Sequence, residues 1–352
     1  MSGISHCESV KLANMSWLCA VFIVVLHVLS LGTAANPGGF VFAQLFGVGL
    51  CPVAVPFFFL ASGWMLGRHV DEEGWWPREL KKRVRTILLP FAVLSVIGFI
   101  GSNGAVILAR VMHGQGLEGV FTVPGVLADF GLNPFDFPGH NVMWFLRVLM
   151  ILVVVSPVFV ALIRKSGIVF PLLVLFVACS SQAYTYYGEN TPLKLFLKTT
   201  MNETGFAFFT LGLYLKMTGR SLCLKRSSGC VFLCLGVVLF VVRFLLGSQG
   251  EWGARLSLAL SRPMAIGMIF GLISLLPAIR CPWAWTSFAI FVLHTYFTCV
   301  LNVSHALPPH LGLEHYLGVT FLVVALSMGL AWSIVTYLPE VGDLLFGGRV
   351  KR

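Results

Sequence analysis

The amino-acid sequence predicts an all-α, polytopic membrane helix bundle of about ten transmembrane helices. Of its 352 residues, 57% are hydrophobic and only 11% are charged, and the mean hydropathy is +0.89. Long apolar runs alternate with short polar breaks along the whole chain. Most Lys and Arg residues fall in every second break, which is the bias expected of cytoplasmic loops. This composition excludes a soluble globular protein.

Ten apolar runs are long enough, or nearly long enough, to cross a bilayer, which takes about 20 residues. We expect spans near 13–32, 46–66, 87–109, 142–162, 168–186, 204–217, 229–247, 257–277, 284–303 and 316–338. The sixth run is short. No long polar insertion separates the runs, so residues 1–352 are expected to form a single integral-membrane domain. The first run is long for a signal peptide ending near Ala34–Ala35, and we interpret it as an uncleaved span.

The positive charges orient these spans. With the N-terminus in the cytoplasm, seventeen of the 24 Lys and Arg residues lie on the inner side and five on the outer side, and Arg147 and Arg262 fall within spans. Both termini are therefore expected in the cytoplasm. The same bias accounts for the net charge of +10, so nucleic acid is not needed as a partner.

Two predicted spans contain a histidine. His27 interrupts the apolar run Met15–Gly32, and His294 lies near the middle of the ninth span. An ionisable residue inside the membrane is costly and by default marks a functional site. For His27, the alternative is an imidazole that is hydrogen-bonded to a neighbouring helix for structural reasons alone.

A metal site is not expected. His305, His310 and His315 are spaced five residues apart, and that spacing does not place side chains on one helical face. The nine cysteines contain no CxxC pair, so neither a disulfide framework nor a zinc site is indicated.

Two arginines enter their spans from the expected outer side. Trp144 suits the membrane interface, and Arg147 follows roughly 9 Å inside the fourth span at 1.5 Å per residue. Arg262 lies beside Pro263 near the outer end of its span. Their similar depth, shared with His27, suggests one wet cavity, although an arginine can also extend back to the membrane surface.

A basic stretch follows the second span on the expected inner side. It contains Arg68, Arg83 and Arg85 and closes at Pro90. One interpretation is an anchor beside anionic lipid. The other is a phosphate site, because guanidinium groups bind polyanions through two parallel hydrogen bonds. The span before it is broken by glycine and proline, which membrane helices tolerate where they pack on protein or line a cavity.

No phosphate-binding glycine loop, nucleophile elbow or zinc-protease motif is present. Taken together, six segments resemble the acyltransferase 3 family, whose members are bacterial multi-spanning membrane enzymes that O-acylate carbohydrates. These segments are Ala20–His27, Val55–Gly63, Lys82–Pro90, Met143–Pro157, Phe209–Leu215 and Ser287–His294. Their order and spacing cover nearly the whole chain.

One position departs from the family pattern. The family typically has an arginine eleven residues before the histidine of the first span, and Ser16 stands there in this sequence. Lys11 lies five residues earlier, roughly 7.5 Å along a helix, which is too far for a simple replacement.

The resemblance implies an acyltransferase that moves an acyl group, with acetyl the expected one, from acyl-CoA to a hydroxyl of a surface or lipid-linked glycan. His27 would be the catalytic base or acyl carrier. The expected substrate-binding residues are Ser62, Trp144, Arg147, Arg262 and His294, and the expected donor-binding residues are Arg68, Arg83 and Arg85. The resemblance further implies no cofactor besides the acyl-CoA substrate, and a place in the bacterial cytoplasmic (inner) membrane.

Two alternatives remain open at this stage. Broken helices and ionisable groups inside the membrane also suit a transporter or flippase, but no inverted repeat is evident and Glu203 lies only at the edge of a span. The serine at position 16 is also compatible with an inactive member of the enzyme family.

Overall fold

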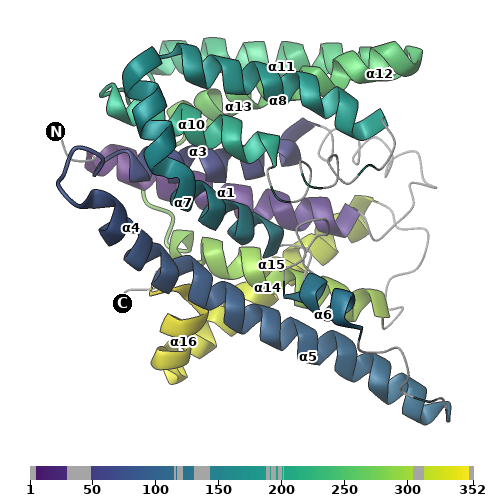
Figure 1. The fold of residues 1–352 in the computed structure, drawn as a ribbon. Helices are drawn as coiled ribbons and strands as arrows, with labels where there is room; N and C mark the ends of the chain where they lie inside the picture. The colour runs from purple at the N-terminus through teal and green to yellow at the C-terminus, as the bar shows by residue number, and fades with distance from the viewer. Residues whose placement is uncertain are drawn as a thin grey trace.

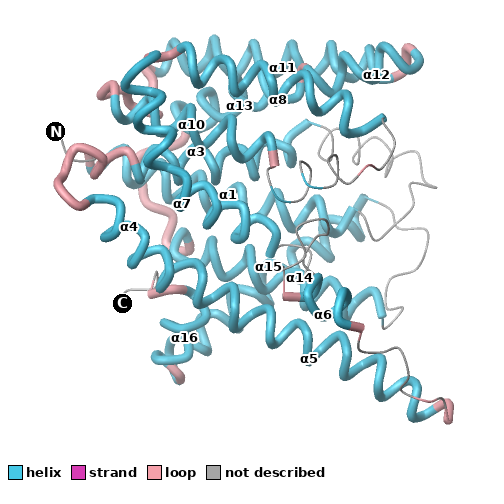
Figure 2. The backbone as a smooth tube through the Cα atoms, viewed as in Figure 1, coloured by secondary structure: helices cyan, strands magenta, loops and turns pink. Residues whose placement is uncertain are grey.

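In the computed structural model, all regular elements among the described residues are helical (Figure 2). The structure describes residues 5–29, 49–114, 116, 122–130, 143–187, 191, 196, 200, 202–303 and 313–348. The helices are α1 (His6–Leu29), α3 (Ala54–Leu66), α4 (Trp75–Arg83), α5 (Leu89–Met112), α6 (Val123–Asp129), α7 (Met143–Ser166), α8 (Val169–Tyr187), α10 (Glu203–Met217), α11 (Arg226–Gly247), α12 (Gly250–Ala259), α13 (Ser261–Leu275), α14 (Ser287–Val303), α15 (Leu313–Tyr337) and α16 (Pro339–Phe346).

A helix is found at each of the ten predicted spans, but the count of ten crossings is not confirmed. Within the described part of the chain, seven helical stretches are long and apolar enough to cross a bilayer. The helices at the second and fifth predicted spans, Cys51–Leu66 and Val169–Ser181, are apolar but shorter, and α10 has 15 residues. The chain is thus an all-α polytopic membrane protein.

The third predicted span begins earlier than expected. α4 runs into α5 through a π-helical segment, Val84–Leu88, so that one stretch from Trp75 to Gly101 is long and apolar enough to span. Within the basic stretch, Arg83 and Arg85 are therefore helical, whereas Arg68 lies in the turn that follows α3. Arg83 is the last residue of α4 and Arg85 lies in the π-helical segment.

Glycines allow two helix pairs to approach closely. A Cβ atom on Gly63 of α3 would lie 2.1 Å from the carbonyl oxygen of Phe209, and one on Gly212 of α10 would lie 2.0 Å from that of Leu60. α11 and α13 meet in the same way through Gly236 and Gly267. Small residues at contact points are typical of helix pairs in membranes, where close van der Waals packing drives association.

α1 runs through the bundle and contacts α3, α14 and α15. Both chain termini and α4 lie at one end of the bundle, while α12 lies at the opposite end (Figure 1). The first turns of α1 are tied to the end of α13 and its following loop, because Lys11 Nζ donates to Ser274 O at 2.6 Å and Asn14 Nδ2 donates to Ile279 O at 2.8 Å. These bonds fix the helix that carries Ser16 and His27.

Candidate active site

The two intramembrane histidines meet. The imidazole rings of His27 on α1 and His294 on α14 have centroids 5.0 Å apart, at an interplanar angle of 45°. His294 is fully buried and His27 half-buried. His294 Nδ1 lies 3.0 Å from Ile290 O. A carbonyl oxygen only accepts hydrogen bonds, so Nδ1 carries the proton and, in the neutral ring, Nε2 is the acceptor atom.

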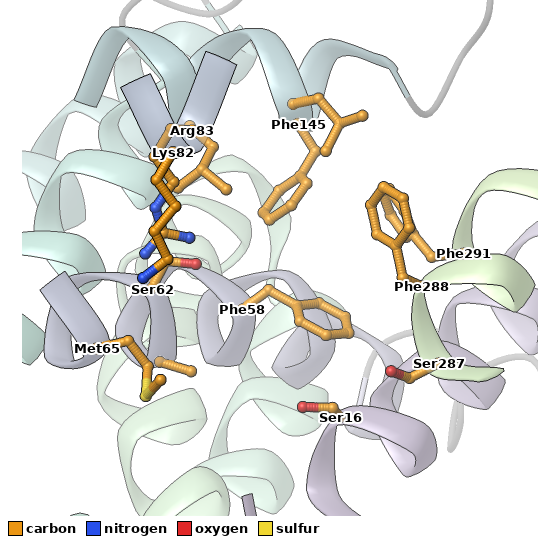
Figure 3. Close-up of a pocket in the computed structure, with 13 residues that line it drawn as sticks. Ser16, Phe58, Ser62, Met65, Lys82, Arg83, Phe145, Ser287, Phe288 and Phe291 are labelled. Atoms are coloured by element: carbon orange, nitrogen blue, oxygen red, sulfur yellow. The ribbon is translucent and has the colours of Figure 1, made fainter. Parts of the chain in front are cut away.

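A cavity of about 320 Å³ lies on the side of this histidine pair that faces α4 and the end of the bundle with the chain termini. We call it the basic cavity; its lining residues are Ser16, Phe58, Ala61, Ser62, Met65, Lys82, Arg83, Phe145, Leu146, Leu149, Ser287, Phe288 and Phe291. Lys82, Arg83 and Ser62 gather on one side of it and the phenylalanines on the other (Figure 3). This volume is at the lower end of the range typical of small-molecule sites.

The phenylalanine side of the basic cavity connects it to the histidine pair. The ring centroids of Phe58, Phe145 and Phe291 are 5.4 to 6.1 Å from one another. The Phe291 ring is 6.5 Å from the ring of His294. A molecule in the basic cavity therefore has one aromatic side chain between it and the histidines.

A buried carboxylate orders the basic side of the cavity. Glu79 is 5% exposed; its oxygens lie 3.1 Å from Lys82 Nζ and 3.4 Å from Arg83 Nε. Just before α4, Glu72 accepts a hydrogen bond from His69, and this bond, with smaller contributions from Arg78, lowers the pKa of the Glu72 carboxyl. Because Glu79 faces both Lys82 and Arg83, these three residues carry a net positive charge beside the cavity.

Ser16 lines the basic cavity, although its hydroxyl donates to Leu12 O at 2.8 Å within α1. Lys11, the nearest preceding cation, is bound to Ser274 O and does not line this cavity. The positive charge at the cavity that Ser16 lines comes instead from Lys82 and Arg83 on α4. Lys82 belongs to the basic stretch of the sequence, but the sequence does not single it out.

A second cavity, of about 260 Å³, lies where α3, α7 and α10 begin and α11 ends. We call it the paired-arginine cavity; it is lined by Pro52, Val55, Pro56, Trp144, Asn202, Thr204, Arg243, Ser261, Arg262 and Ala265. Trp144 and Arg262 were predicted to bind substrate, and they meet here. Arg243, one of the five Lys and Arg residues counted on the outer side, lies within α11 and is 6% exposed.

The remaining predicted residues lie elsewhere. Arg147 is half-buried on α7 and His27 faces His294, and neither lines the paired-arginine cavity with Arg262. A single wet cavity for all three therefore stays a prediction. Arg68 is half-buried after α3 and Arg85 is exposed, and neither lines the basic cavity. His305 and His310 lie outside the described residues.

The family model described as an acyltransferase domain matches residues 14–338, from within α1 to the end of α15. The chain belongs to the acyltransferase 3 family. No curated protein and no solved structure matches the chain significantly. Membership makes this membrane protein an acyltransferase, and its matched region contains the histidine pair and both cavities.

Proposed function

We propose that the chain transfers an acyl group, with acetyl the expected one, from acyl-CoA to a hydroxyl of a surface or lipid-linked carbohydrate. The observation that supports this most is the basic cavity, which places two cations near the histidine pair. The carbohydrate acceptor is suggested by the family resemblance. No cofactor besides acyl-CoA is needed for this reaction.

Acyl-CoA has an anionic nucleotide end and a thin pantetheine arm, and the basic cavity suits that division. Lys82 and Arg83 would bind phosphate oxygens near the cavity mouth through charge-assisted hydrogen bonds. The phenylalanines on the opposite side would contact the apolar part of the arm and direct the thioester toward His294. The nucleotide itself would remain outside, over α4, because the cavity holds only part of such a molecule.

His27 acts in this proposal as the general base. It takes the proton from the acceptor hydroxyl, the hydroxyl oxygen forms a bond to the thioester carbonyl carbon, and the carbon–sulfur bond breaks. The leaving thiolate then takes up the proton from the imidazolium, so charge and protons balance. His294, with its proton held on Nδ1 by Ile290, would accept a hydrogen bond at Nε2 and orient the His27 ring. Arg147 would orient the acceptor or stabilise the oxyanion.

The proposed setting is the bacterial cytoplasmic membrane, with both termini in the cytoplasm. The two termini lie at the same end of the bundle as the basic cavity's cations on α4 (Figure 1). The charge bias of the sequence favours the cytoplasm for that end. Acyl-CoA is available there, and the paired-arginine cavity would then open toward the outer side.

Release of free thiol from acetyl-CoA by the purified protein, in the presence and absence of a membrane glycan extract, tests this function. An acyltransferase releases thiol faster when the glycan is added and labels the glycan with radioactive acetyl groups. Intact acetyl-CoA and unlabelled glycan after incubation with folded protein would contradict the proposal, and would favour a transporter or an inactive family member.

A further inference from the structure

We propose that three phenylalanine rings between the basic cavity and the histidine pair limit the donor to short acyl groups. The rings are those of Phe58, Phe145 and Phe291, which we call the phenylalanine cluster. All three line the basic cavity, and they belong to three different helices, α3, α7 and α14. That the ligand is an acyl thioester rests on the proposed acyl transfer, whereas the argument for a barrier rests on the packing of the rings.

The three rings of the cluster pack directly on one another. The centroid of Phe58 lies 6.0 Å from that of Phe145 and 6.1 Å from that of Phe291, and the last two are 5.4 Å apart. These separations fall within the range of packed aromatic pairs, roughly 4.5–7 Å. An acyl chain therefore cannot pass between the rings where they stand.

The cluster lies directly beside the histidine pair. The ring of Phe291 is 6.5 Å from that of His294, which is itself 5.0 Å from the ring of His27. The cluster also lies on the side of the cavity opposite its two cations (Figure 3). A donor whose phosphates contact those cations therefore meets the cluster with its thioester end before it reaches the histidines.

The three rings differ in their burial. Phe145 and Phe291 are 6% and 5% exposed, whereas Phe58 is half-buried. Each of the three has a further ring beside it, at a centroid distance of 4.7 to 6.4 Å, so burial is what distinguishes them. A buried ring that turns needs space that a close-packed interior lacks. Phe58 is therefore the ring that turns aside at least cost.

One displaced ring makes room for a small acyl group only. A longer group would have to displace Phe145 or Phe291 as well, and forcing extra methylenes into a packed interior is unfavourable. The basic cavity, at about 320 Å³, has no large volume in reserve for a longer chain. We therefore expect the protein to use acetyl-CoA and to discriminate against butyryl-CoA.

An apolar cavity without a barrier predicts the opposite order. Each buried methylene favours binding, so a longer acyl group would then bind more tightly. A cluster that ends the available space reverses this order, because the added methylenes must displace packed side chains. The order of affinity with chain length thus distinguishes a selective barrier from phenylalanines that only pack the bundle.

The experiment compares acetyl-CoA, propionyl-CoA and butyryl-CoA by two readouts. Thiol release gives kcat/KM, which we expect to fall by about 10-fold or more from acetyl-CoA to butyryl-CoA. Thermal unfolding of the purified protein reports binding without turnover, because a ligand that binds the folded state raises its unfolding temperature. The rise should be smaller with butyryl-CoA than with acetyl-CoA.

Two variants and one control locate the effect. Phe58→Ala removes the movable ring and should lower the preference for acetyl-CoA over butyryl-CoA by about 10-fold or more. Phe58→Leu keeps an apolar side chain and remains informative if Phe58→Ala folds poorly; it should change the preference in the same direction. Phe232→Ala is the matched control, since Phe232 is a half-buried phenylalanine of α11 that packs on Phe270 at 5.6 Å and does not line the cavity. It should keep the parental preference.

Two results would overturn the proposal: parental protein that uses and binds butyryl-CoA as well as acetyl-CoA, or an unchanged preference in folded Phe58→Ala and Phe58→Leu proteins. Absence of thiol release from all three donors contradicts the proposed acyl transfer, and the thermal shifts then decide about the cluster. Shifts that fall with chain length, and that Phe58→Ala makes equal, leave the size limit standing as a property of binding. Equal shifts in the parental protein contradict the size limit too.

Discussion

At the scale of single residues, the contact between His27 and His294 is the feature most relevant to chemistry. The two residues are 267 positions apart in the sequence, and their rings lie 5.0 Å apart because α1 packs on α14. His294 is fixed from its own helix by Ile290 O. His294 is fully buried and His27 is half-buried, so His27 is the more accessible of the two rings, which is why we assign the base to it.

Replacing His27 with glutamine tests this assignment. Glutamine keeps hydrogen-bonding capacity but is not a comparable base, so we expect normal membrane insertion and a loss of thiol release of about 10²–10⁴-fold. His315→Gln is the control, because His315 is an exposed histidine near the start of α15. Near-parental turnover by well-folded His27→Gln protein would transfer the catalytic assignment to His294.

Arg83→Ala tests the donor side of the proposal. Loss of a charge-assisted hydrogen bond to a phosphate should raise the KM for acyl-CoA by about 10- to 100-fold, with little change in the KM for the acceptor. Steady-state kinetics with each substrate varied in turn measures both. Arg78→Ala is the matched control, since Arg78 lies on the same helix but is exposed and paired with Glu72. Unchanged donor dependence in Arg83→Ala would leave Arg83 as an anchor at the membrane surface.

At the scale of elements, the close approach of α3 and α10 supports both cavities. α3 contributes Ser62 to the basic cavity and Val55 to the paired-arginine cavity, and α10 contributes Thr204 to the latter. The two helices approach closely because Gly63 and Gly212 lack side chains at the contact. Any change in the separation of α3 and α10 would therefore move residues that line both cavities.

Gly212→Ala should destabilise the bundle. The added Cβ would lie 2.0 Å from the backbone oxygen of Leu60, which cannot move independently of α3. Overpacking of this kind costs about 1–3 kcal/mol. We expect a lower unfolding temperature and a lower yield of monodisperse protein in size-exclusion chromatography.

Gly329→Ala provides the comparison for this substitution. Gly329 lies within α15, and a Cβ atom there would meet no described atom within 4 Å. Its unfolding temperature should stay at the parental value. Equal behaviour of the two variants would show that the contact between α3 and α10 is looser than the structure indicates.

At the scale of the whole molecule, α5 separates two positions whose membrane sides are predicted to differ. Residue 75 begins α4 and residue 125 lies in α6, beyond the far end of α5. The charge bias predicts that residue 75 faces the cytoplasm. Reporter fusions after residues 75 and 125 should therefore report opposite sides, with residue 75 inside. Reports from one side only would overturn the topology.

The sequence by itself determined the all-α membrane class and the approximate place of the helices at the ten predicted spans, because apolar length and charge bias are local properties of each segment. It did not predict α4, α6 or α16. It also singled out His27, His294, Arg83, Trp144 and Arg262 as costly or interfacial groups. The family pattern in its segments, matched over residues 14–338, made the chain an acyltransferase.

Only the tertiary structure decided which of these groups meet. It placed His27 against His294, placed Arg83 with Ser62 and Lys82 in one cavity, and paired Arg262 with Arg243 in another. It also showed that the later part of the basic stretch, with Arg83 and Arg85, is helical and continues into α5. The physical reason is that helix contacts depend on close packing between segments far apart in the chain, such as Gly63 against Phe209, which hydropathy along one segment does not encode.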